Sequence, residues 1–182
     1  MKTFPAVEMG FHPEQNLVEY LFSPAAISST AASMAAGIAV QIIEKLNMVG
    51  VLAVEMFVVN DQILVNEIAP RPHNSGHQTI EGNITSQYDQ HLRCILGLPL
   101  GDTDIKIPSA MINLLGEPGY AGPAIYEGIN LVLALEGTKV HLYGKTMTKP
   151  YRKMGHVTIV DDHRERLLEK AKFVKHTLKV KA

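Results

Sequence analysis

Two glutamates lie inside neighbouring apolar stretches of strand length, and their type and spacing point to a divalent cation. Glu55 belongs to the first stretch and Glu67 to the second, and both stretches are rich in aliphatic residues. The polar break Asn60-Asp61-Gln62 predicts a three-residue hairpin loop, and this register places Glu55 opposite Glu67. Like charges directly opposite one another destabilise a sheet, so we expect a cation between them. Two carboxylates, with the Asn66 amide beside them, suit Mg²⁺ that is shared with water and phosphate, which indicates phosphoryl transfer.

Simpler interpretations of these residues stay open. Arg71 follows the second stretch and could neutralise one carboxylate as a structural ion pair. A two-residue turn would put the glutamates on opposite faces of the hairpin and remove the argument for a metal. A metal site made by His73 and His77, four positions apart, is disfavoured because Pro72 and Gly76 argue against the helix that this spacing needs.

Composition narrows the class of protein. The chain has 182 residues, 46% of them hydrophobic and 19% charged, which suits a globular protein with one substantial core. A net charge of -1 gives no basic footprint for nucleic acid. The single cysteine, Cys94, excludes an internal disulfide and fits a reducing compartment. We therefore expect a soluble, cytoplasmic protein that binds neither nucleic acid nor membrane.

The elements that position the glutamates follow from periodicity and end signals. We expect strands at 2–9 and 16–22, a helix from Ser28-Ser29-Thr30 to about residue 47, the glutamate hairpin, and a helix that begins at Thr85. The first helix should bury a stripe formed by Met34, Ile38, Ile42 and Leu46, and the second a stripe that includes Tyr88, Leu92 and Ile95.

After Gly101 the composition of the chain changes, and glycine and proline residues separate short apolar runs. A last helix is expected from a capping box at Asp162 and Glu165. The expected fold class is α+β, with helices and an antiparallel sheet first and a small, mainly β part after them. The runs expected to be strands are 109–115, 128–135, 139–143 and 156–160, and the last helix should bury Leu167, Ala171, Val174 and Leu178.

Three segments together resemble one known family. They are Glu55-Met56-Phe57 with the run from Asn66 to His77, then Gln87 to Gly101, and His141 to Val157. This combination is similar to the 5-(carboxyamino)imidazole ribonucleotide synthases, also called the ATPase subunit of phosphoribosylaminoimidazole carboxylase, in the ATP-grasp superfamily. The resemblance covers the chain from Phe4 to about Ala171. It implies the C-terminal portion of an ATP-grasp domain at 1–107 and a small β-rich domain with a terminal helix at 108–182.

The resemblance also implies a reaction. ATP would activate bicarbonate as carboxyphosphate, and the amine of 5-aminoimidazole ribonucleotide would capture the carboxyl group, in de novo purine synthesis. Glu55 and Glu67 would hold Mg²⁺ against the ATP phosphates. The further roles implied are catalysis for Arg71 and His73, nucleotide binding for Asn66, Glu67 and His12, substrate binding for Asn74, Ser75 and His77, and binding of the 5′-phosphate for Lys145 and Arg152.

Members of this family are longer than this chain and carry an ATP lid that the sequence does not match. We therefore expect the isolated chain to be inactive, and the full-length protein to be a homodimer. Three alternatives stay open. The basic loop that holds Lys145 and Arg152 could be a solvated face, the chain could come from another carboxylating or formylating ATP-grasp enzyme, or it could be a non-catalytic ligand-binding or dimerising module.

Overall fold

The computed structural model describes residues 1–11 and 18–182. The chain forms two compact units, each built from separate parts of the sequence. The first unit joins Met1–Glu8 to Ser23–Lys106, and the second joins Met9–Phe22 to Ile107–Ala182.

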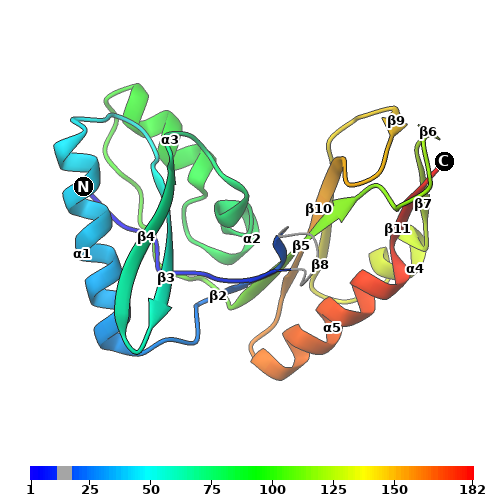
Figure 1. Ribbon diagram of the computed structural model, residues 1–182, viewed down its shortest axis with the longest axis horizontal. Coiled ribbons are helices and arrows are strands. Elements are labelled where there is room, and N and C mark those ends of the chain that lie inside the picture. Colours follow the sequence, from blue (N-terminus) through cyan, green and yellow to red (C-terminus); the bar gives the residue numbers. More distant parts are fainter. Residues whose placement is uncertain (12–17) are drawn as a thin grey trace. The chain divides into compact units, whose positions relative to one another are not determined.

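In the first unit, helix α1 (Ser29–Lys45) packs against a two-stranded hairpin formed by β3 (Ala53–Val59) and β4 (Gln62–Ala69) (Figure 1). The hydroxyl of Ser28 accepts from the Ala31 N–H at 3.1 Å, so the expected N-terminal cap of this helix is confirmed. The expected buried stripe is wrong at its ends, since Met34 is 45% and Leu46 51% exposed.

The register of the hairpin differs from the expected one in an informative way. Val59 pairs with Gln62, so the loop has two residues, and both have positive φ (Asn60 49°, Asp61 60°) as a tight hairpin turn requires. The prediction of a three-residue loop is therefore wrong. Strand β4 nevertheless carries one extra residue, because Met56 pairs with Val65 while Glu55 pairs with Glu67. This bulge at Asn66 brings Glu67 opposite Glu55 despite the shorter turn.

Three short elements complete the first unit: η1 (Asn74–Gly76), α2 (Thr79–Gly82) and α3 (Gln87–Ile95). The hydroxyl of Ser86, and not that of Thr85 as expected, caps α3 by accepting from the Asp89 N–H. The expected apolar stripe of α3 is also wrong, since Leu92 and Ile95 are about half exposed and the buried residues are two glutamines. These are Gln87 and Gln90.

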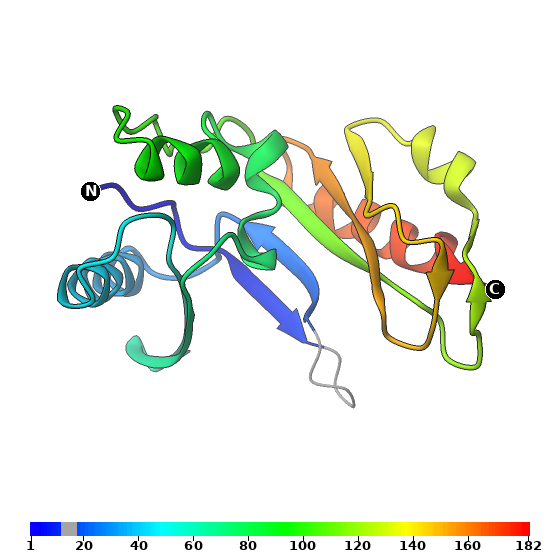
Figure 2. The same cartoon turned by 90° about the horizontal axis from the view of Figure 1, so that it is seen from above.

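The second unit is built on a five-stranded sheet with the order β1-β2-β5-β10-β8. Helix α5 (Arg164–Thr177) packs on β5 and β10, as Figure 2 shows. Alternate residues of β5 enter the core, which α5 closes with Leu167, Ala171 and Val174, so this expected helical stripe is confirmed. The strands are β1 (Glu8–Phe11), β2 (Val18–Ser23), β5 (Ser109–Leu115), β8 (Thr138–Leu142) and β10 (Lys153–Val160).

One expected strand of the second unit is a helix. The run 128–135 forms α4 (Ile129–Leu133), and Gly128 precedes it with φ of 79°. A Cβ on Gly128 would lie 2.1 Å from the carbonyl oxygen of Thr177, so only glycine fits there. A short apolar run bounded by glycines is compatible with either a strand or a buried helix, which explains the error.

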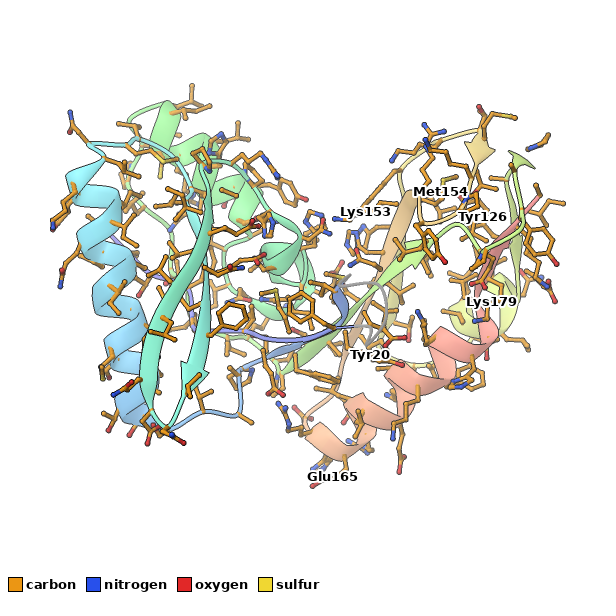
Figure 3. The ribbon with its side chains drawn as sticks, in the orientation of Figure 1. Tyr20, Tyr126, Lys153, Met154, Glu165 and Lys179 are labelled. Atoms are coloured by element: carbon orange, nitrogen blue, oxygen red, sulfur yellow. The ribbon has the colours of Figure 1, made fainter. Side chains whose placement is uncertain are left out.

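Small paired strands close the second unit. Strand β7 (Ile125–Glu127) pairs with β11 (Lys179–Lys181), and β6 (Gly122–Pro123) pairs with β9 (Met147–Thr148). Tyr126 of β7 packs against the core to which the fully buried Met154 of β10 belongs (Figure 3).

The start of α5 depends on Asp161 and not on the expected capping box. The N-cap position is His163, and its side chain makes no capping hydrogen bond. The Asp161 carboxylate, whose side chain is only 6% exposed, instead accepts from the His163 N–H at 3.0 Å and pairs with Arg166 (2.7 Å) and Lys170 (2.8 Å). Burial alone would raise the pKa of Asp161, but these partners hold it well below its usual range.

The expected α+β class is confirmed, since helices and antiparallel strands make up both units. Within the described residues, no helix has the length and apolar character needed to span a lipid bilayer. The domain limits 1–107 and 108–182 stay a prediction.

Candidate active site

The two glutamates of the hairpin meet a histidine from the segment that follows β4. Glu55, Glu67 and His73 each offer one ligand atom, and these atoms all lie within 4.8 Å of one another. Glu55 and His73 are half-buried, while Glu67 is exposed. This is the one group of potential metal ligands found in the part of the chain that the structure describes.

His73 faces Glu55 with its Nε2, at 3.7 Å from the carboxylate Oε1. The main-chain N–H of Ser75, which can only donate, points to Nδ1 of His73 at 3.4 Å, and the Ser75 hydroxyl lies 3.0 Å from the same nitrogen. This contact favours a proton on Nε2, directed at Glu55. The two carboxylates are then the natural cation ligands, and such an oxygen donor set fits Mg²⁺.

Arg71 does not serve as the structural partner of the glutamates. Its guanidinium is exposed and donates to the carbonyl of Pro72 at 3.1 Å, and none of the ion pairs among the described residues joins it to Glu55 or Glu67. The ion-pair interpretation of the hairpin therefore finds no support, and the guanidinium remains accessible to an anion.

The side chain of Gln87, at the start of α3, makes hydrogen bonds to the segment from His73 to His77. The Gln87 Oε1 accepts from the His73 N–H at 2.9 Å, and Nε2 donates to the His73 carbonyl at 2.9 Å. The hydroxyl of Thr79 adds a second link, since it accepts from the Gln87 N–H at 2.8 Å and donates to the Gly76 carbonyl. A Cβ on Gly76 would lie 2.5 Å from the Gln87 Oε1, so glycine permits the close approach.

His77 is not a member of the group formed by Glu55, Glu67 and His73. Its Nδ1 is 2.9 Å from the Gln87 Nε2 and 2.7 Å from the Tyr88 hydroxyl, and its ring stacks on Tyr88 with centroids 5.9 Å apart. Burial raises the pKa of the Tyr88 hydroxyl, while its contact with Gln87 lowers it in part, so Tyr88 keeps its proton at neutral pH. Among the described residues, no group of three potential metal ligands contains both His73 and His77.

The predicted phosphate ligands belong to the second unit, in the connection between β8 and β10. The ammonium of Lys145 donates to the Lys153 carbonyl and lies 5.6 Å from the centre of the Tyr143 ring. The guanidinium of Arg152 donates to the Met147 carbonyl at 3.0 Å. Both cations are half-buried and tethered to carbonyls of one connection, unlike the exposed Lys149 between them. Each of the two cations therefore has a main-chain hydrogen-bond partner.

The structure says less about three other predicted site residues, Asn66, Asn74 and His12. Asn66 is exposed at the bulge, and the Asn74 carbonyl accepts from the His77 N–H within the turn of η1. His12 lies outside the described residues.

Two family models match most of the chain. An ATP-grasp domain matches residues 1–88, and a phosphoribosylaminoimidazole carboxylase C-terminal domain matches residues 109–170. The N5-carboxyaminoimidazole ribonucleotide synthase of Bacillus subtilis is 44% identical over 161 residues, which are 88% of this chain and 40% of that protein. The chain belongs to the N5-carboxyaminoimidazole ribonucleotide synthase family.

Solved structures of this synthase family have the same fold. The synthetase from Thermotoga maritima superposes with a TM-score of 0.86 at 52% identity, over 89% of this chain and 45% of that one. The Aspergillus clavatus synthase, solved with ADP and 5-aminoimidazole ribonucleotide, gives a TM-score of 0.84 at 32% identity, over 95% of this chain and 47% of that one. The chain thus spans less than half the length of these members of the synthase family.

Against this synthase framework, sequence reasoning missed how the polar residues are connected. It did not place His73 beside Glu55 and Glu67, and it gave no role to Gln87, although Gln87 lies inside a segment that resembles the family. The sequence offered only a glutamine near the start of an expected helix. The burial of Gln87, which obliges its amide to find hydrogen-bond partners, is visible in the structure alone.

Proposed function

We propose that this chain supplies the metal-binding carboxylates and part of the substrate site for ATP-dependent carboxylation of 5-aminoimidazole ribonucleotide with bicarbonate. The observation that carries the proposal is the direct cross-strand pairing of Glu55 with Glu67, with His73 beside them. Two carboxylates in this arrangement repel each other unless a cation binds. When bound, Mg²⁺ would neutralise charge on the ATP phosphates during phosphoryl transfer.

The residues of the first unit would act by holding anions. The exposed fork of Arg71 suits a planar oxyanion such as bicarbonate or carboxyphosphate, which it can bind through two parallel hydrogen bonds. His73, with its Nε2 directed at Glu55, would keep that carboxylate oriented. Asn74, Ser75 and His77 would line the substrate side.

Lys145 and Arg152 would bind the 5′-phosphate of the ribonucleotide. Their tethers to the Lys153 and Met147 carbonyls hold two cationic heads in one connection, which lowers the entropy lost when a phosphate binds. Exposed Lys149 of the same connection provides a matched control. We expect K145A and R152A each to weaken the binding of ribose 5-phosphate to this chain by roughly 10-fold or more, and K149A to change it by less than about 2-fold, in a titration followed by NMR. Equal effects of all three substitutions would support a solvated basic loop instead.

The activity would also require the part of the family members that lies outside the segment matched by this chain. The test mixes the chain with the remaining portion of the Bacillus subtilis relative and measures ATP hydrolysis as bicarbonate and 5-aminoimidazole ribonucleotide are added or withheld. We expect hydrolysis that depends on both, and none from the chain alone. Hydrolysis that ignores the ribonucleotide would support a different ATP-grasp enzyme, and no hydrolysis in a mixture shown to associate would support a non-catalytic module.

A further inference from the structure

The side chain of Gln87 contacts both the main chain of His73 and the imidazole ring of His77. It is 3% exposed, and its amide contacts both polar groups of the His73 main chain and the ring of His77. Each of these three contacts is 2.9 Å long.

The main chain of His73 fixes which end of the amide is which. Its N–H can only donate, so the atom of Gln87 that it contacts is the oxygen, and its carbonyl can only accept, so the other atom is the nitrogen. The NH₂ group of Gln87 has two hydrogens and no lone pair available for hydrogen bonding. One hydrogen goes to the His73 carbonyl, and the second points at Nδ1 of His77.

The orientation of this amide in turn fixes the histidine. A nitrogen that receives a hydrogen bond must present a lone pair, so Nδ1 of His77 carries no proton and Nε2 does. The hydroxyl of Tyr88 also contacts Nδ1, but a hydroxyl can donate or accept and is compatible with either tautomer. Gln87 alone among these contacts distinguishes the tautomers.

We propose that Gln87 is a positioning residue that holds His77 as the tautomer with its proton on Nε2, so that this nitrogen acts as a hydrogen-bond donor to an anionic ligand. An Nε2 lone pair would repel an anion and would suit a metal ion instead. The tautomer follows from the contacts within the first unit, whereas the role toward an oxyanion or phosphate ligand rests on the proposed function.

The first experiment measures the tautomer in this chain without any ligand. Imidazole ¹⁵N shifts and long-range ¹H–¹⁵N couplings show which nitrogen of each neutral histidine carries the proton. We expect His77 to carry it on Nε2, and Y88F to leave it there. A proton on Nδ1 in the unmodified chain overturns the inference, and this readout does not depend on any variant.

The second experiment replaces the donor with an acceptor. In Q87E the carboxylate cannot donate to Nδ1 and instead accepts from it, so we expect the His77 proton to move to Nδ1. Gln90 offers a matched control on the same helix, because its buried amide makes the same two hydrogen bonds to the main chain of Gly101 (2.9 and 3.1 Å). None of the hydrogen bonds found for this amide among the described residues goes to a histidine. We expect Q90E to leave the His77 proton on Nε2. An unchanged proton in a folded Q87E chain overturns the inference.

The reconstituted mixture tests the role toward the ligand. We expect Q87E to lower kcat/KM for the ribonucleotide-dependent reaction by roughly 10- to 100-fold relative to Q90E, as expected for a lost hydrogen bond to a charged group. If the tautomer shifts as expected and kcat/KM does not change, the role toward the ligand is wrong. If the unmodified mixture shows no ribonucleotide dependence, the proposed function fails while the tautomer assignment stands.

Discussion

Replacing Glu67 with glutamine should change stability in opposite directions with and without a metal ion. In the absence of metal, Glu67 and Glu55 are two like charges on paired residues, and E67Q removes their repulsion while keeping the size of the side chain. With Mg²⁺ present, the same substitution removes a ligand. E67Q should therefore raise the free energy of unfolding of the metal-free chain and lower that of the metal-saturated chain.

The size of each effect follows from the geometry. Ligand atoms of the two glutamates lie within 4.8 Å of each other, and Glu67 is exposed, so a high effective dielectric applies. Coulomb's law then gives a repulsion of about 1 kcal/mol, which corresponds to a rise in Tm of roughly 2–4 °C on substitution. Mg²⁺ at about 100 times its dissociation constant should add ~2.7 kcal/mol to the unmodified chain, a rise of roughly 5–10 °C.

Thermal unfolding, followed by circular dichroism with EDTA or with a Mg²⁺ series, measures both effects. The matched control is E44Q, which removes the same charge from an exposed position on α1 and should leave the Mg²⁺ shift intact. A lower Tm for E67Q in EDTA would refute the repulsion. An equal Mg²⁺ shift in E67Q and the unmodified chain would refute the metal site.

Three further substitutions test the supports of the site and the second unit. Q87L removes three hydrogen bonds from a buried position and should lower the free energy of unfolding by about 2–4 kcal/mol in urea titrations. G76A places a Cβ 2.5 Å from the Gln87 Oε1 and should cost about 1–3 kcal/mol in the same assay, so an unchanged midpoint would contradict the close approach. The depressed pKa of Asp161 contributes stability above about pH 4, and this contribution is lost as the pH falls toward the pKa of the folded state. D161N should therefore have a lower free energy of unfolding at pH 7, and this free energy should fall less steeply than that of the unmodified chain as the pH is lowered below about 4. If the free energy of unfolding fell equally steeply with pH in D161N and the unmodified chain, Lys170 and Arg166 would not stabilise the carboxylate.

The parts of the fold that sequence predicted best are those set by local signals. The Ser28 cap, strand 109–115 and the buried stripe of the last helix depend on residues close together in the chain, and each is confirmed. The helix at 129–133 was missed because its short apolar run has no distinctive period, and its place is set by contact of Gly128 with Thr177, far along the chain.

The site shows the same division between local and distant information. The pairing of Glu55 with Glu67 was correctly anticipated for the wrong reason, because a two-residue turn and a bulge at Asn66 produce it together. Bulges leave little trace in a hydrophobic pattern, so sequence alone could not locate this one. The contact of His73 with Glu55 depends on how Gln87 folds the following segment back, and that is tertiary information.

The division of the chain into units has a consequence for how such proteins exchange parts during evolution. The chain passes from one unit to the other three times, after residues 8, 22 and 106, and β2 of the early segment borders β5 of the late one. A recombination event that moved residues 107–182 alone would carry an incomplete sheet, with the edge of β5 left unpaired and open to aggregation. The second unit is therefore discontinuous in sequence. A chimeric protein that takes residues 107–182 from one donor needs residues 9–22 from the same donor.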